Sequence, residues 1–216
     1  MTETDWLTCD HPYAMLEHVK RTASDRKRRL FATGCCRRIW PLIPSCFHEA
    51  VDVAEAYGDG LVTNKVRKSL EKRLRTRWQE LHFGGSAAYA ALECLKKDVG
   101  WHPGSPHSAV QAAWGKESLA RQVEICSTEF AAQAALLRDI IGNPFYRLKA
   151  DLAYQTPTVT ALATGIYAEQ AHDRLPILAD ALQEAGCEDR DVLDHCRGDG
   201  PHARGCWVVD LVLGKD

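Results

Sequence analysis

The chain has 216 residues, of which 45% are hydrophobic and 26% are charged, the composition of an ordinary globular protein. Its net charge of −2 gives no overall attraction for nucleic acid or for a membrane surface, and no apolar run approaches the roughly 18 residues of a membrane span. The first residues are acidic and no apolar leader follows them, so we expect a cytoplasmic protein without a membrane partner.

Helix signals dominate the first part of the chain. Ser24 and Ser45 are good N-caps, and Pro41 and Gly58 are good stops. An apolar stripe with spacings of 4, 4, 4 and 3 then predicts a helix with Leu74 and Trp78 in the core. The expected helices cover Pro12–Val19, Ser24–Pro41, Ser45–Tyr57 and the stripe of Val66, Leu70, Leu74, Trp78 and Leu81, and an Ala-rich segment follows from Ser86 to about Lys97.

The second part is also helical up to its last residues. The loop at 100–106 carries two prolines and divides the single domain into two expected subdomains, 1–99 and 107–216. Further helices are expected over Glu117–Ile141, Pro157–Gln170, Asp173–Ala185 and Asp189–Cys196. The run from Cys206 to Leu213 is continuously apolar, and its pattern fits either a buried strand or a short helix. The predicted fold is therefore mainly α, a compact helical domain with a short irregular or strand-like C-terminal tail.

A cluster of cysteine and histidine is the most concentrated candidate site. The chain has nine cysteines, and in a cytoplasmic protein these are reduced thiols, core residues or metal ligands. The spacing C-x7-H-C-x5-H-x3-C near the C-terminus supplies five donors for a structural zinc ion, which needs four. The candidate metal ligands are Cys187, His195, Cys196, His202 and Cys206.

Three interpretations of this cluster stay open. The spacing matches no standard zinc finger, and adjacent residues such as His195 and Cys196 rarely bind one ion together. The same residues would also serve as buried cysteines and hydrogen-bonded histidines. A third interpretation is an enzyme with a cysteine nucleophile and a histidine base. The chain contains no nucleophile elbow, phosphate-binding loop, dinucleotide glycine motif or zinc-protease motif, and we assign no catalytic residue.

Two basic runs, Lys20–Arg38 and Lys65–Arg77, give residues 1–80 an excess of 15 Lys and Arg over 11 Asp and Glu. These runs have enough positive charge to bind phosphates. The alternative is that they form only solvent-exposed helix faces. No aromatic side chains alternate with the charges, so any nucleic-acid binding is expected to be weak and non-specific.

Two segments carry a family resemblance. One is the run SDRKRRLFATGCCRRIW from Ser24, and the other extends from Asp173 to Cys187 and from His195 to Lys215. With the Met1–Leu16 opening and Asn143-Pro-Phe, they resemble a multi-copy family of uncharacterised planctomycete proteins, over about half of the chain and not over residues 60–120. That resemblance implies no activity.

A weaker resemblance concerns Arg174–Gly186, which is similar to a helix of a short domain that accompanies repeats in proteins of similar origin. It implies a docking or scaffold role. The favoured function is accordingly a non-enzymatic interaction or regulatory module that contacts a protein partner and carries a structural zinc site. The alternatives are a nucleic-acid-associated protein that uses the basic helices and an enzyme built on the C-terminal cysteines and histidines.

Overall fold

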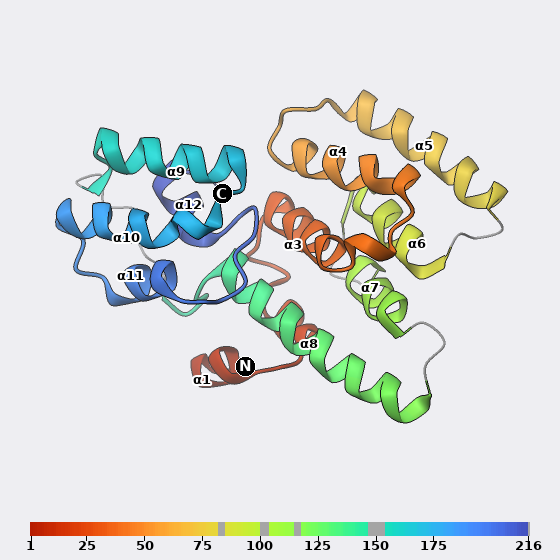
Figure 1. Cartoon of the computed structure of the whole chain (residues 1–216), viewed down its shortest axis with the longest axis horizontal. Helices are drawn as coiled ribbons and strands as arrows, with labels where there is room; N and C mark the ends of the chain where they lie inside the picture. Colours follow the sequence, from red (N-terminus) through yellow and green to blue (C-terminus); the bar gives the residue numbers. More distant parts are fainter. Residues whose placement is uncertain (82–84, 100–103, 115–117, 147–153, 216) are drawn as a thin grey trace. The chain divides into compact units, whose positions relative to one another are not determined.

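The computed structural model describes all residues except 82–84, 100–103, 115–117, 147–153 and 216. The described residues form helices joined by turns and loops, with no strand among them, which confirms the mainly α prediction (Figure 1). No helix in this part of the chain is both long and apolar enough to cross a membrane.

The chain divides into two compact units, unit 1 (Met1–Ala134) and unit 2 (Ala135–Asp216). The division falls inside the long helix α8 (Leu119–Ile141). The loop at 100–106, where a division was expected, has residues 100–103 outside the described part of the chain. Gly104 already begins helix α7, which packs against α6 within unit 1.

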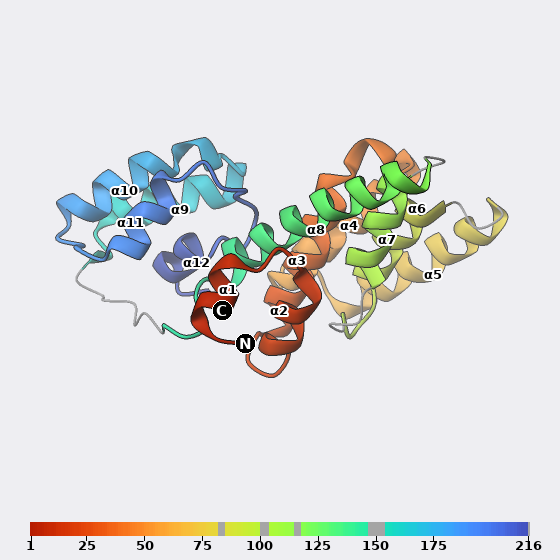
Figure 2. The same cartoon turned by 90° about the horizontal axis from the view of Figure 1, so that it is seen from below.

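Unit 1 is built around the Ala-rich helix α6, which packs against α3, α4, α5 and α7. Its run of buried alanines lets neighbouring backbones approach closely, since alanine adds little bulk. Figures 1 and 2 both place α5 at the outer edge of this unit. The helices of unit 1 before α8 are α1 (Glu3–Thr8), α2 (Pro12–Val19), α3 (Asp25–Arg38), α4 (His48–Gly58), α5 (Asn64–Glu80), α6 (Gly85–Cys94) and α7 (Gly104–Trp114), with short 3-10 turns η1 (Trp40–Leu42) and η2 (Ser45–Phe47).

The predicted apolar stripe of α5 is core only at its centre. Leu70 and Leu74 are buried, whereas Trp78 is half-buried and Val66 is 48% exposed. The reason is the position of α5 at the outer edge of unit 1, where it packs against α4 and α6.

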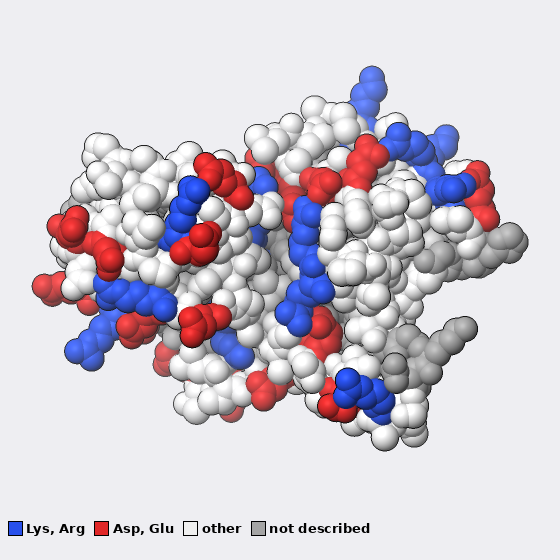
Figure 3. Space-filling model, in the orientation of Figure 1, with Lys and Arg blue, Asp and Glu red and all other residues white. Residues whose placement is uncertain are grey.

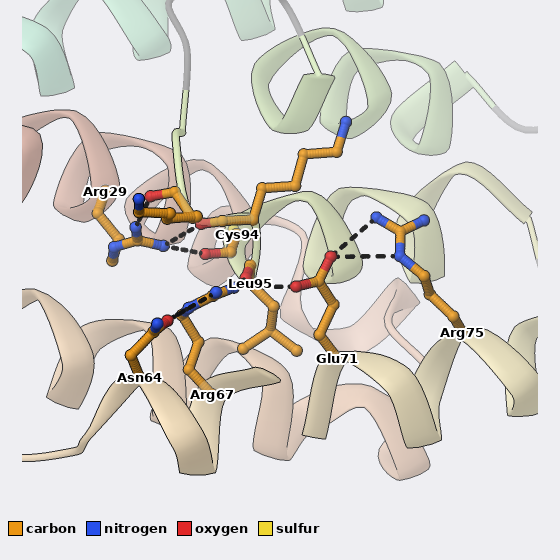
Figure 4. A network of polar contacts seen from close by, with 9 residues as sticks. Arg29, Asn64, Arg67, Glu71, Arg75, Cys94 and Leu95 are labelled. Atoms are coloured by element: carbon orange, nitrogen blue, oxygen red, sulfur yellow. Dashed lines mark hydrogen bonds and ion pairs between the residues drawn. The ribbon is translucent and has the colours of Figure 1, made fainter. Parts of the chain in front are cut away.

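Two buried arginines stabilise the end of α6 (Figure 4). Arg29 on α3 donates hydrogen bonds to the carbonyls of Cys94, Lys96 and Lys97 at 2.5–3.0 Å. Arg67 on α5 donates to the Leu95 carbonyl. The last carbonyls of a helix have no partner within the helix, and cations are favourable beside them. Residues that resemble surface charges in the sequence therefore hold three helices of unit 1 together.

Replacing Arg67 by glutamine should destabilise unit 1. Arg67 is 1% exposed, so its loss leaves the Leu95 carbonyl unsatisfied at a cost of about 1–3 kcal/mol. Arg75→Gln is the matched control, because Arg75 binds the same Glu71 but is 39% exposed, and its loss should cost about 0–1 kcal/mol. Denaturant unfolding measures both changes, and equal costs would contradict the role of Arg67.

Unit 2 contains the last turns of α8 and four further helices that share one apolar core. They are α9 (Pro157–Glu169), α10 (Leu175–Glu184), α11 (Arg190–Arg197) and α12 (Trp207–Leu213), with the 3-10 turn η4 (His172–Arg174) before α10. The strand-like alternative for the C-terminal run is wrong, because Trp207–Leu213 is a helix that packs against α9 and α11. Residues 198–206 before it are irregular, as expected.

Candidate metal site

A buried carboxylate lies at the centre of the candidate site. Asp139 sits near the end of α8 between the buried residues Leu136, Leu137 and Ile140, and it is itself 2% exposed. A charge removed from water in this way is costly unless other groups compensate it. The partners of Asp139 therefore decide what this part of unit 2 can do.

Two histidines and one backbone amide meet this carboxylate. His202 Nδ1 lies 2.9 Å and His195 Nε2 lies 3.2 Å from the same oxygen, Oδ1, while the Ala203 amide donates to Oδ2 at 2.9 Å. Burial acts to raise the pKa of Asp139, but the hydrogen bonds from His195 and His202 outweigh it, and the pKa is lowered from its usual value. Asp139 is therefore an anion in this site.

Cys206 completes the group from the N-terminus of α12. Its Sγ lies 3.2 Å from His195 Nε2, and the residue is 1% exposed. Gly205 allows the turn before it, with a φ of 94° that side chains rarely adopt. Burial, with a contribution from Asp139, raises the pKa of the Cys206 thiol well above its ordinary value. A bound cation would reverse this, because a metal ion deprotonates a coordinating thiol.

The donor atoms of Asp139, His195, His202 and Cys206 all lie within 4.8 Å of one another. They come from α8, the end of α11, the 198–206 loop and the start of α12. Ligands at about 2.0–2.3 Å from one tetrahedral ion are roughly 3.3–3.8 Å apart, so side-chain shifts of about 1 Å would bring all four to one metal. This part of unit 2 has the donors to bind a metal ion.

The hydrogen-bonding pattern also suits metal ligation. His202 directs Nδ1 toward the cluster and Nε2 toward the Gly198 carbonyl at 3.2 Å. A metal-bound histidine characteristically donates its other N–H to a backbone carbonyl, which fixes the ring. His195 presents the single atom Nε2 to both Asp139 and Cys206. The donor atoms thus point toward one another instead of forming a chain.

The structure brings together three of the five residues proposed from the sequence, His195, His202 and Cys206. Cys196 is buried in the apolar core of unit 2, as is Cys187, and neither belongs to the group of converging donors. Successive residues of a helix point about 100° apart, so Cys196 faces the core where His195 faces the site. Burial raises the pKa of Cys196 to about 12, as expected of a core thiol.

Asp139 is the residue that the sequence analysis missed. It lies 63 residues before His202 in the chain, in a helix that reads as ordinary amphipathic core. Its position on the apolar face of the helix could have indicated a site, because a buried carboxylate must have a partner.

The same geometry argues against a cysteine hydrolase. In a nucleophile–histidine–acid relay the two ring nitrogens have separate partners, one the nucleophile and the other the acid. Here His195 uses Nε2 for both. Cys206 is also buried, and its raised pKa opposes thiolate formation in the absence of a cation.

No protein-family model, curated protein or solved structure matches this chain. The resemblance to the planctomycete family stays a prediction.

Trp207 connects the site to the end of α8. Its ring lies 5.1 Å from that of His195, and a Cβ added to Gly142 would come within 3.1 Å of it. Gly142 also has a φ of 74°, which favours glycine. This close approach holds α12, and with it Cys206, beside Asp139.

Gly142→Ala should therefore destabilise the protein, by about 1–3 kcal/mol, through backbone strain and displacement of Trp207. Gly165→Ala in α9 is the control, because no atom lies within 4 Å of the added Cβ, and it should stabilise by about 0.5–1 kcal/mol. Guanidinium unfolding gives both values, and shifts of the same sign would refute the close-packing argument.

Proposed function

We propose that this chain is a non-enzymatic helical interaction module whose unit 2 is stabilised by one structural zinc ion. The observation that carries the proposal is that the donor atoms of four buried or half-buried residues lie within 4.8 Å of one another. Asp139, His195, His202 and Cys206 would be the ligands. Two imidazoles and one thiolate favour zinc over magnesium or calcium, which prefer oxygen.

Charge balance supports this assignment. The Asp139 carboxylate and a Cys206 thiolate carry two negative charges, which one Zn²⁺ neutralises. A neutral cluster removes the cost of burying these groups in the core. Four protein ligands also leave no position for water or substrate, which is typical of structural and not of catalytic zinc.

The interaction role rests on a surface of unit 2. An open, mainly apolar groove runs along α9, and Ile177 on α10 is also exposed. The groove is lined by Pro157, Thr158, Ala161, Leu162, Gly165 and Arg174. Exposed apolar patches commonly mark contacts with other proteins. A protein partner is therefore the kind we propose for this unit.

Zinc should stabilise the wild-type protein, and this stabilisation should require the four proposed ligands. Zinc at a free concentration of 100 Kd adds about 2.7 kcal/mol, which shifts the melting temperature of a chain of this length by about 5–11 °C. A chelator should reverse the shift. Cys206→Ser and Asp139→Asn should each abolish stoichiometric zinc in protein purified without a His-tag.

Cys196→Ala is the matched control. It removes a neighbouring buried thiol that faces the core, so it should keep one zinc per chain at the cost of core stability. Circular dichroism establishes that each variant is folded before its metal content is measured. A wild-type protein without zinc and insensitive to the chelator would refute the proposal, as would full zinc content in both ligand variants.

A further inference from the structure

The two basic runs of the chain have different roles in unit 1. In the first run, arginines of α3 pair with acidic side chains of other elements: Arg26 with Asp59, Arg37 with Glu55 and Arg38 with Glu129, at 2.8–2.9 Å. These three arginines therefore form ion pairs within unit 1. In the second run, on α5, Arg67 is internal in the same way, but the lysines are not.

Lys65, Lys68 and Lys72 form one face of α5. Their spacing of three and four residues places them on one side of the helix, and all three are exposed. In the described part of the chain no acidic side chain pairs with any of them. Figure 3 shows several groups of Lys and Arg atoms along this outer edge of unit 1, over α5, with Asp and Glu atoms beside some of them.

Two arginines lie on the adjoining side of α5, because 100° per residue places Arg73 about 100° and Arg77 about 140° around the helix from Lys72. Arg73 pairs with Glu49 and Arg77 with Glu80, but all four side chains are more than half exposed. Surface pairs of this kind are weak and exchange readily for another anion. Beside these arginines lies an open groove of about 630 Å³. Its cationic and hydroxyl lining residues are Lys72, Arg73, Arg77, Ser69 and Thr76, and Cys46, Leu74 and Glu80 complete the lining.

We propose that this face of α5, with its groove, binds the sugar–phosphate backbone of a nucleic acid without reading its sequence. Lys65 to Lys72 span about 10 Å of helix axis, a length over which a duplex presents several phosphates. An extended row of this kind fits a polyanion better than a single phosphate group.

The composition of the face favours nucleic acid over other partners. Protein interfaces are enriched in aromatic residues and depleted in lysine, the reverse of this surface. Trp78, the aromatic residue of α5, lies against Tyr89 of α6, with ring centroids 5.5 Å apart, and is not on the lysine face. Insertion into a membrane needs an apolar helix face, and that of α5 packs against α4 and α6.

The test measures fluorescence anisotropy of labelled duplex DNA and duplex RNA with the full chain. Affinity in the non-specific range, with Kd of about 10⁻⁴–10⁻⁶ M, is expected for both probes, falling steeply between about 50 and 200 mM salt. The triple variant Lys65→Gln/Lys68→Gln/Lys72→Gln should bind about tenfold or more weakly. The slope of log K against log salt should decrease by about 3.

The control variant Lys20→Gln/Lys97→Gln/Arg190→Gln removes three exposed charges from other elements and should retain wild-type affinity. Equal losses in the two variants, or no binding by the wild type at low salt, would overturn the proposal. So would preferential binding to vesicles that contain phosphatidylserine, the result expected of a membrane-surface protein. The surface lies in unit 1, so this test is independent of zinc binding.

Discussion

The buried charge of Asp139 is the constraint on which the architecture of unit 2 depends. An anion at 2% exposure must be compensated, and its partners come from two segments far along the chain: His195 at the end of α11, and His202 with the Ala203 amide in the 198–206 loop. Each needs a particular local conformation to reach it, such as the left-handed turn at Gly205. The packing of Trp207 on Gly142 then keeps α12 in place.

Unit 1 contains buried cations, Arg29 and Arg67, where unit 2 contains a buried anion. Arg29 and Arg67 have their charge beside the carbonyl end of α6, where the helix dipole and the free carbonyls stabilise it (Figure 4). Both stand over the ring of Tyr57, at 4.8 and 5.3 Å from its centroid. The same sequence run thus supplies a structural arginine on one side of α5 and exposed lysines on the other.

Local sequence signals such as N-caps and apolar spacing predicted most of the helices. They could not predict contacts between residues far apart in the chain. The N-cap predicted at Ser24 marks a real helix start, because capping depends on residues three positions apart, whereas Ser45 begins the 3-10 turn η2 ahead of α4. The apolar residues of Trp207–Leu213 show neither a helical nor a strand periodicity, so the sequence does not distinguish the two. The segment is a helix because of its packing within unit 2. Asp139 and His202 become neighbours only through folding, so no spacing rule could join them.

The central claim is that Asp139, His195, His202 and Cys206 together hold one zinc ion. X-ray absorption at the zinc edge, on protein carrying one equivalent of zinc, measures this ligand set directly. The account predicts one sulfur at about 2.3 Å and three nitrogen or oxygen ligands at about 2.0–2.2 Å. A first shell with two or more sulfurs would place Cys187 or Cys196 on the metal and contradict the assignment, and a shell without sulfur would exclude Cys206.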